Sequence, residues 1–282
     1  MREEQPGGAP EPAAADRAGQ GVVAAFGQSL KTLRVRAKME REELGRRLGY
    51  SASTIASFEQ GRRIPPPEAI ERSDEVLDAS GLLKVWKEQL EKAQYPAFFQ
   101  GMAQLEKQAI ELLSYDTLVV NGLLQTEEYM RALVANHCPP VDAETIEQRV
   151  TARLARQAIF ERRPAPLLSF VMCESVLRRK IGGREVLRGQ LEGLLLAGQR
   201  RNVEIQVMPL DSEDNAGLEG PFTFVTRNDG KRFVYVEAQG TSNLETDHKQ
   251  AVLAAARYGI IRSQAFTPRE SLQFIEKLLG EL

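Results

Sequence analysis

The sequence is poor in cysteine and histidine and has no long apolar run. Its 282 residues include two cysteines and two histidines. Two cysteines cannot form the disulfide framework of a small secreted domain, and they fit a reducing cytosol. No apolar run approaches the roughly 20 residues that a membrane span needs, and residues 1–24 lack the apolar core of a signal peptide. These absences predict a cytoplasmic protein with no membrane contact.

Motifs of catalysis and of metal binding are also missing. The chain has no Gly-x-Ser-x-Gly, no phosphate-binding loop, and no carboxylates whose spacing pairs them for acid–base work. A metal site needs three or four ligands. The scattered candidates are His137, Cys138, Cys173 and His248. We therefore expect no enzyme activity, no cofactor and no metal.

Charge is distributed unevenly along the chain. The net charge is −2, but residues 26–63 contain nine basic and four acidic residues, so this segment carries +5 and the remainder −7. A local basic excess is the electrostatic footprint of a nucleic-acid-binding module. The length suits two domains, and hydrophobic and charged contents of 42% and 27% suit a globular core.

The N-terminal part predicts a small all-α domain. Residues 1–24 are rich in alanine, glycine, proline and charge and predict a disordered tail. Residues 25–80 have apolar positions at helical spacing, divided by glycines and prolines into four short helices. Residues 81–99 predict a helical linker, which carries a fifth helix around Trp86.

Residues 100–282 predict an α+β domain, because helical and alternating patterns are mixed. The expected helices are Gln100–Leu113, Thr126–Val134, Ala143–Phe160, Arg184–Arg200, Leu244–Ser263 and a last one capped by Thr267. The expected strands are Leu167–Met172, Val203–Met208, Phe222–Thr226 and Arg232–Val236, with Thr117–Val120 as a strand or turn. Asn228-Asp229-Gly230 between two of these strands predicts a hairpin.

The segment from Arg41 to Gly61 is the most informative one. Its pattern predicts two short helices that cross each other and are joined by a tight turn. Gly45 permits close helix approach, and Gly49 permits a backbone turn with positive φ. Ser51 is a natural N-cap for the second helix. The apolar positions that fix the crossing angle are Leu44, Leu48, Ile55 and Phe58.

An αα-hairpin inside any helical domain would share part of this pattern. Three further features favour DNA binding: the preceding helix, the basic excess, and the Gly61-Arg62-Arg63 ending. The exposed positions of the second helix carry small or polar residues, which lets a helix lie deep in a major groove. These positions are Ala52, Ser53, Ala56, Ser57 and Gln60.

The segment resembles the Xre/Cro-type helix-turn-helix. The resemblance rests on Leu44-Gly45-x-x-Leu48-Gly49-x-Ser51 followed by Ile55-x-x-Phe58-Glu59-x-Gly61. The remainder resembles the C-terminal domain of unknown function that follows such modules in many regulators of filamentous soil bacteria. The residues that carry this second resemblance include Asn121 to Tyr129, Arg153 to Gln157, Glu174 to Arg179, Val207-Met208-Pro209 and Tyr235-Val236-Glu237.

The resemblance implies roles for single residues. Arg41 stands where the family usually has a glutamine that contacts phosphate, and arginine can make the same contact as a charge. The implied DNA-binding residues are Arg41, Ser51, Ala52, Ser53, Thr54, Ser57, Arg62 and Arg63. Two positions depart from the family, because Ala52 cannot hydrogen-bond a base edge and Ser57 is short. Base readout would then rest on Ser53, on methyl contacts and on DNA shape. We interpret Glu59 as structural, through a local ion pair or cap.

The implied function is a cytoplasmic, nucleoid-associated transcriptional regulator that binds double-stranded operator DNA as a homodimer. The C-terminal domain would dimerise and receive a signal, and in the resembling family a small acidic partner protein is often encoded nearby. Three alternatives remain open: an antitoxin-like protein that binds such a partner, a ligand-sensing regulator, and an enzyme tethered to DNA. The Gly122–Thr126 motif could be a binding loop or a structural turn capped by Thr126.

Overall fold

The computed structural model describes residues 14–95, 97–138, 140–239 and 241–282. The chain forms two compact units that divide between Ala97 and Phe98. Each unit has a hydrophobic core of its own. The units are therefore described separately.

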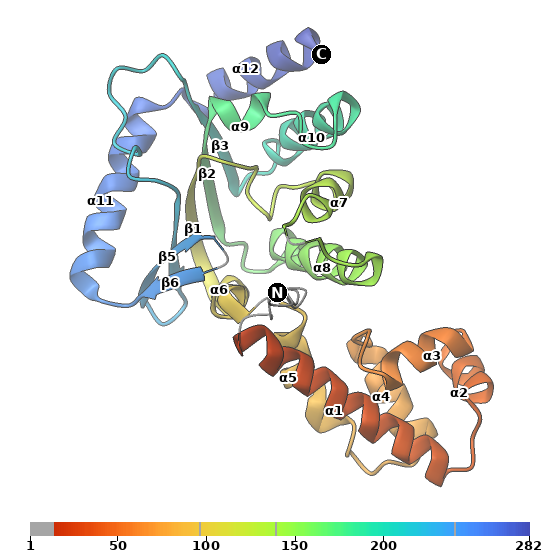
Figure 1. Cartoon of the computed structure of the whole chain (residues 1–282). Coiled ribbons are helices and arrows are strands. Elements are labelled where there is room, and N and C mark those ends of the chain that lie inside the picture. Colours follow the sequence, from red (N-terminus) through yellow and green to blue (C-terminus); the bar gives the residue numbers. More distant parts are fainter. Residues whose placement is uncertain (1–13, 96, 139, 240) are drawn as a thin grey trace, which may run out of the picture. The chain divides into compact units, whose positions relative to one another are not determined.

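The N-terminal unit is all-α (Figure 1). Its elements are α1 (Ala14–Arg36), α2 (Arg41–Leu48), α3 (Ala52–Glu59), α4 (Pro67–Val76), the 3-10 turn η1 (Lys84–Trp86) and α5 (Lys87–Ala93). Helical spacing of apolar residues forms its core, because each helix buries one stripe against the others. Fully buried members include Phe26, Leu30, Leu44, Ile55 and Phe58.

Two predicted boundaries of this unit are wrong. The first helix begins at Ala14, so residues 14–24 are helical rather than a disordered tail; residues 1–13 lie outside the described part. Val23, within the segment expected to be disordered, is buried in the core of the unit. Residues 81–93 are part of the domain rather than a linker, since Leu83 and Leu90 are buried in its core.

The C-terminal unit contains a mixed six-stranded sheet, in the order β3-β2-β1-β4-β5-β6. The strands are β1 (Ala109–Asp116), β2 (Leu167–Cys173), β3 (Val203–Met208), β4 (Phe222–Arg227), β5 (Arg232–Ala238) and β6 (Thr241–Glu245). The first three strands are parallel, whereas β4, β5 and β6 are antiparallel to their neighbours. The expected α+β class is confirmed.

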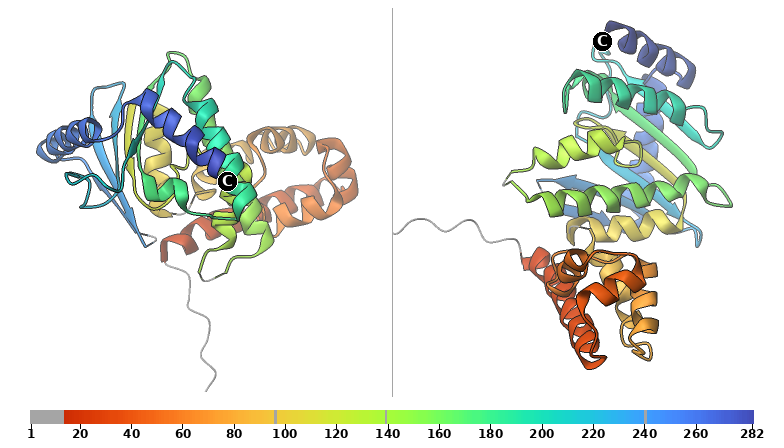
Figure 2. Two further views of the ribbon diagram at one scale, coloured as in Figure 1. Left: turned by 90° about the horizontal axis from the view of Figure 1, so that it is seen from above. Right: turned by 90° about the vertical axis from the view of Figure 1, so that its right-hand side faces the viewer.

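Helices cover both faces of this sheet, as Figures 1 and 2 show. The helical elements are α6 (Ala97–Gln108), α7 (Glu127–Ala135), α8 (Ala143–Arg156), η2 (Gln157–Glu161), α9 (Glu174–Arg178), α10 (Arg184–Ala197), α11 (His248–Gln264) and α12 (Pro268–Glu281). One face packs against α7, α8, α10 and α12 around side chains such as Phe170 and Ile205. The other face packs against α11 through Tyr258 and Ile261.

Several expected elements of this unit are present. The hairpin forms between β4 and β5 around Asn228-Asp229-Gly230. Thr267 caps α12 in a reciprocal capping box with Glu270. Thr126 caps α7, as its Oγ1 accepts from the backbone N–H of Tyr129.

Other expectations are wrong. The helix expected over Gln100–Leu113 ends at Gln108, and the chain continues as β1. The reason is tertiary, because β1 is a central strand between β2 and β4, where both its faces are covered. Leu244 belongs to β6, and α11 begins only at His248 after the cap residue Asp247. The short helix α9 and the strand β6 were not predicted.

Candidate nucleic-acid interface

The turn between α2 and α3 depends on two glycines. Gly49 ends α2 with φ of +83°, in the left-handed region that an L side chain rarely adopts. At Gly45 a Cβ would lie 2.5 Å from the carbonyl oxygen of Tyr50. Any side chain there would force the turn away from α2. Both glycines are therefore needed for the crossing of the two helices.

Ser51 fixes the start of α3. Its Oγ accepts a hydrogen bond from the backbone N–H of Thr54 at 3.1 Å. The same oxygen lies 2.8 Å from Ser53 Oγ and 2.9 Å from Thr54 Oγ1. The N-terminus of α3 is thus capped by a cluster of three hydroxyls, of which Ser51 and Ser53 are exposed. An N-terminus of this kind carries a partial positive charge and favours phosphate.

The outward side of α3 is made of short side chains. Ser53 is exposed, and Ala52, Ala56 and Ser57 are partly buried, whereas the longer, exposed Gln60 follows the last residue of α3. The inward side carries Ile55 and Phe58, which are fully buried. Without long side chains on its outer face, α3 can bring its backbone close to the base edges of a major groove.

Glu59, at the end of α3, is the centre of a buried ion-pair network. Its side chain is fully buried and accepts from Arg34 Nε at 2.5 Å and Nη2 at 3.2 Å. Arg41 Nε donates to the other carboxylate oxygen at 2.7 Å. Burial alone would raise the pKa of Glu59, but the hydrogen bonds and charges of Arg34 and Arg41 outweigh it and hold that pKa below its usual range.

This network joins three helices. Arg34 lies in the last turn of α1, Arg41 opens α2 and Glu59 ends α3. Arg34 Nη1 also donates to the carbonyl of Met39 at 2.7 Å. The ion pairs of Glu59 are therefore long-range rather than local. Arg41, expected as a phosphate contact, has its Nε committed to Glu59 while about a third of its side chain is exposed.

Four arginines lie at the rim of the motif. Arg46 and Arg47 both pair with Glu43 on the surface of α2, at 2.5 and 2.7 Å. Arg62 and Arg63 follow α3 and are exposed. The backbone N–H groups of both donate to the carbonyl of Ser57, and the guanidinium of Arg63 lies 5.9 Å from the ring centre of Phe58. Glu43 thus offsets part of the positive charge of α2, and Arg62 and Arg63 add two exposed positive charges beyond the end of α3.

Seven of the eight expected DNA-binding residues lie on α3 or close to its ends, and the eighth, Arg41, opens α2 and contacts α3 through Glu59. Sequence reasoning did not find Arg34, the buried partner of Glu59. One signal was available in hindsight, since Arg34 follows Leu33 and Leu30 on the buried side of α1. A charged residue in a buried stripe indicates a buried partner of opposite charge.

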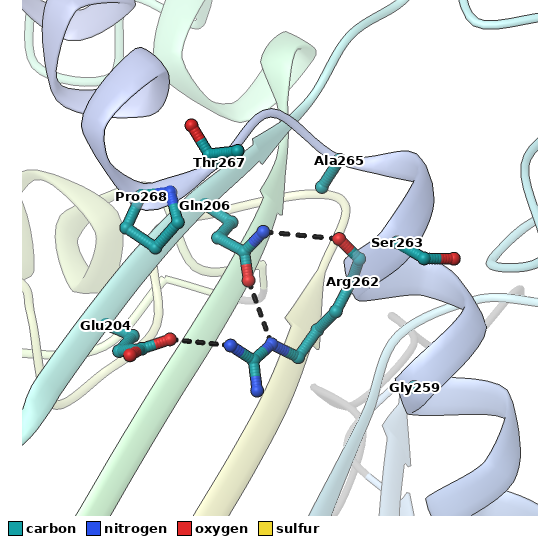
Figure 3. A pocket seen from close by; sticks show the side chains of 8 residues that line it. All are labelled: Glu204, Gln206, Gly259, Arg262, Ser263, Ala265, Thr267 and Pro268. Atoms are coloured by element: carbon teal, nitrogen blue, oxygen red, sulfur yellow. Dashed lines mark hydrogen bonds and ion pairs between the residues drawn. The ribbon is translucent and has the colours of Figure 1, made fainter.

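The C-terminal unit has an open pocket of about 580 Å³ beside the edge strand β3 (Figure 3). Its polar side chains satisfy one another: Arg262 donates from Nε to Gln206 at 2.9 Å and from Nη2 to Glu204 at 2.6 Å. Gln206 in turn donates to the carbonyls of Arg262 and Phe266. With its charges paired, this pocket is a weak candidate for a ligand site. Across the described residues, no three His, Cys, Asp or Glu side chains are placed to hold a metal ion.

Comparisons with known proteins agree with the two-unit division. Residues 25–84 match a helix-turn-helix domain family, and residues 99–277 match the family described as a domain of unknown function, DUF5753. No curated protein and no solved structure matches the chain. None of the helices in the described parts has the length and apolar character to cross a membrane. The chain belongs to the DUF5753 family and carries, ahead of that domain, the helix-turn-helix domain of a DNA-binding regulator.

Proposed function

We propose that the protein is a sequence-specific transcriptional regulator of the Xre/Cro type, which binds operator DNA in the cytoplasm and places α3 in the major groove. The observation that carries the proposal is the surface of α3, where short side chains lie between a capped N-terminus and an exposed arginine pair. The proposed function includes no enzyme activity. The C-terminal unit receives the signal, from a ligand or from a small partner protein.

The contacts divide into two classes. Ser53 and Ser57 on α3 face the bases, with Ala52 available for a thymine methyl group. Arg62 and Arg63 contact phosphate and fix the register of α3 on the duplex. Arg41 contacts phosphate with the part of its guanidinium that Glu59 does not hold.

Footprinting on the DNA upstream of the coding sequence, at two salt concentrations, tests this proposal. We expect a protected, nearly palindromic site and an affinity that falls steeply with salt. Arg62→Ala should lower the slope of log K against log salt by about 0.9, the contribution of one phosphate contact. The matched control is Arg184→Ala, which removes an exposed arginine of the C-terminal unit and should leave the slope unchanged. Absence of protection at both salt concentrations would contradict the proposal.

We further propose that the regulator is a homodimer, because one helix-turn-helix reads only a half-site, and dimers reach half-sites about 34–36 Å apart. The outer face of α11 supports this part. Val252, Leu253 and Ile260 on that face are 44%, 59% and 51% exposed, with Ala256 and Gly259 between them. In Figures 1 and 2 no other helix in the described part of the C-terminal unit lies over α11 on its side of the sheet.

A second copy fits this face by its own symmetry. In an antiparallel crossing centred on Ala256, Val252 of one α11 lies opposite Ile260 of the other, and the small residues let the two backbones approach closely. Such a contact uses the same patch on both subunits, as a two-fold dimer requires. It also keeps Lys249 of the two copies at opposite ends of the helix pair.

Sedimentation velocity tests the dimer. Ala256→Glu puts two carboxylates at the centre of the crossing and should convert dimer to monomer. Gln250→Glu introduces the same charge on the flank of α11 and should leave the dimer intact. A wild-type protein that sediments as a monomer at micromolar concentration, or an unaffected Ala256→Glu dimer, would exclude α11 as the interface.

A further inference from the structure

Three arginines lie along one side of α8, at positions 149, 153 and 156. Arg156 has a complete set of partners. It donates two hydrogen bonds to Glu106, at 2.7 and 2.8 Å, in a pair that is almost fully buried, and its guanidinium lies 4.2 Å from the ring centre of Phe99. Arg156 is therefore a structural residue that joins α8 to α6.

Arg153 is different, because it is partly buried without a carboxylate partner. Its Nη1 donates one hydrogen bond, to the neutral amide oxygen of Gln125 at 2.9 Å. Within the described residues no Asp or Glu lies in ion-pair distance of Arg153 or of Arg149, one turn earlier on α8. Glu237 acts on Arg153 only at a distance, and its carboxylate accepts from Tyr235 Oη at 2.9 Å.

The partner of Arg153 is held rigidly. Gln125 is 2% exposed, and its Nε2 donates to the carbonyl of Val120 at 2.6 Å. Gln157, which directly follows α8, donates to the backbone carbonyl of Gln125 at 2.8 Å. The amide oxygen of Gln125 is thus fixed toward Arg153. This places the Gly122–Thr126 motif directly against the arginines of α8.

The charge of Arg153 is not compensated in this arrangement. Burial lowers the pKa of Arg153 to about 10, and the charges of Arg156 and Arg149 add to this effect more than Glu237 and Glu106 oppose it. A desolvated cation without a counter-ion is unfavourable for folding. A bound anion would supply the missing opposite charge and remove this unfavourable contribution to the free energy of folding.

We propose that Arg153 and Arg149, with the Gly122–Thr126 turn, form a binding site for a small oxyanion ligand that carries a carboxylate or a phosphate group. A guanidinium offers a planar fork of N–H donors that matches both groups, and two adjacent arginines can hold one anion between them. Gln125 acts as a positioning residue that fixes the fork of Arg153. The site is independent of DNA binding, so its test does not depend on the proposed regulator function.

Titration calorimetry of the full chain tests the site. The probes are inorganic phosphate and acetate, each added at constant ionic strength against chloride. Hydrogen exchange on the same samples should show protection in residues 120–126 and in α8. A response to phosphate alone assigns a phosphorylated ligand, and a response to acetate assigns a carboxylate ligand; either supports the proposal.

Variants separate a ligand site from a structural arginine. Arg153→Gln and Arg149→Gln should each weaken anion binding at least tenfold, whereas Arg184→Gln on α10 should not change it. Without anion, Arg153→Gln should unfold at the wild-type temperature or above, because an uncompensated charge has been removed. Two results would overturn the proposal: wild-type protein that binds neither probe, or an Arg153→Gln variant that unfolds several degrees lower in the absence of anion.

Discussion

Replacing Glu59 by glutamine should strongly destabilise the N-terminal unit. The substitution keeps the shape of the side chain but leaves Arg34, whose side chain is 8% exposed, as a buried charge without a counter-ion. Breaking a buried pair by removing one partner costs about 3–5 kcal/mol. Because small domains are stable by only about 5–15 kcal/mol, this is a large share of the total.

The chain contains its own probe for this measurement. Trp86 is the single tryptophan, and it packs against the core of the N-terminal unit. Urea unfolding followed by tryptophan fluorescence therefore reports on this unit within the full-length protein. The matched control is Glu43→Gln, which removes a carboxylate that pairs with Arg46 and Arg47 at the surface. Surface ion pairs contribute little, so its unfolding midpoint should stay close to the wild-type value.

The pH dependence provides a second check. The folded-state pKa of Glu59 is lowered, so its stabilising effect is present above the unfolded-state pKa of about 4.3 and is lost as the pH falls through the folded-state value. The difference between wild type and Glu59→Gln should then shrink as the pH is lowered below about 4. A loss under 1 kcal/mol at pH 7, or equal effects of Glu59→Gln and Glu43→Gln, would refute the role given to the buried network.

Three further predictions concern other parts of the chain. Gly45→Val should abolish DNA binding and lower the Trp86-reported midpoint, since a Cβ would lie 2.5 Å from a backbone oxygen; normal binding would contradict the turn geometry. Burial raises the pKa of Asp116 to about 7, so the C-terminal unit loses stability as the pH rises from about 4 to 7. Calorimetric unfolding should show that Asp116→Asn removes this loss of stability, which reaches roughly 4 kcal/mol at pH 8. A pH profile of stability that Asp116→Asn leaves unchanged would contradict the prediction. Thr267→Ala removes the capping box of α12 and should cost about 1 kcal/mol in the same assay, whereas Thr241→Ala on the exposed strand β6 should not.

The helix-turn-helix could be predicted because its determinants are local. Gly49 and Ser51 act on their own backbone and on the next turn of helix, so the sequence window contains both partners of each interaction. The same holds for the hairpin between β4 and β5 and for the cap of α12. Where an element is determined by residues close in sequence, the local sequence pattern is sufficient to predict it.

The central strand β1 could not be predicted in this way. Its residues carry a pattern that also fits the end of a helix, and what selects the strand is pairing with β2 and β4. Those partners lie more than 50 residues away in the sequence. The partners of Glu59 were missed for the same reason, since Arg34 and Arg41 are 25 and 18 residues distant. Local propensity cannot identify contacts of this kind.

The long-range pairs also explain how a carboxylate is tolerated at the end of a helix that approaches a polyanion. Alone, Glu59 would repel the phosphates on either side of the groove that receives α3. Arg34 and Arg41 bring the group of three to a net charge of +1, and burial of the carboxylate leaves Arg41 as the member that faces outward. The network thus fixes the angle between three helices and keeps the adjacent surface positive. Within the proposed function, Glu59→Gln should therefore weaken operator binding through lost orientation of α3, although it makes the local charge more positive.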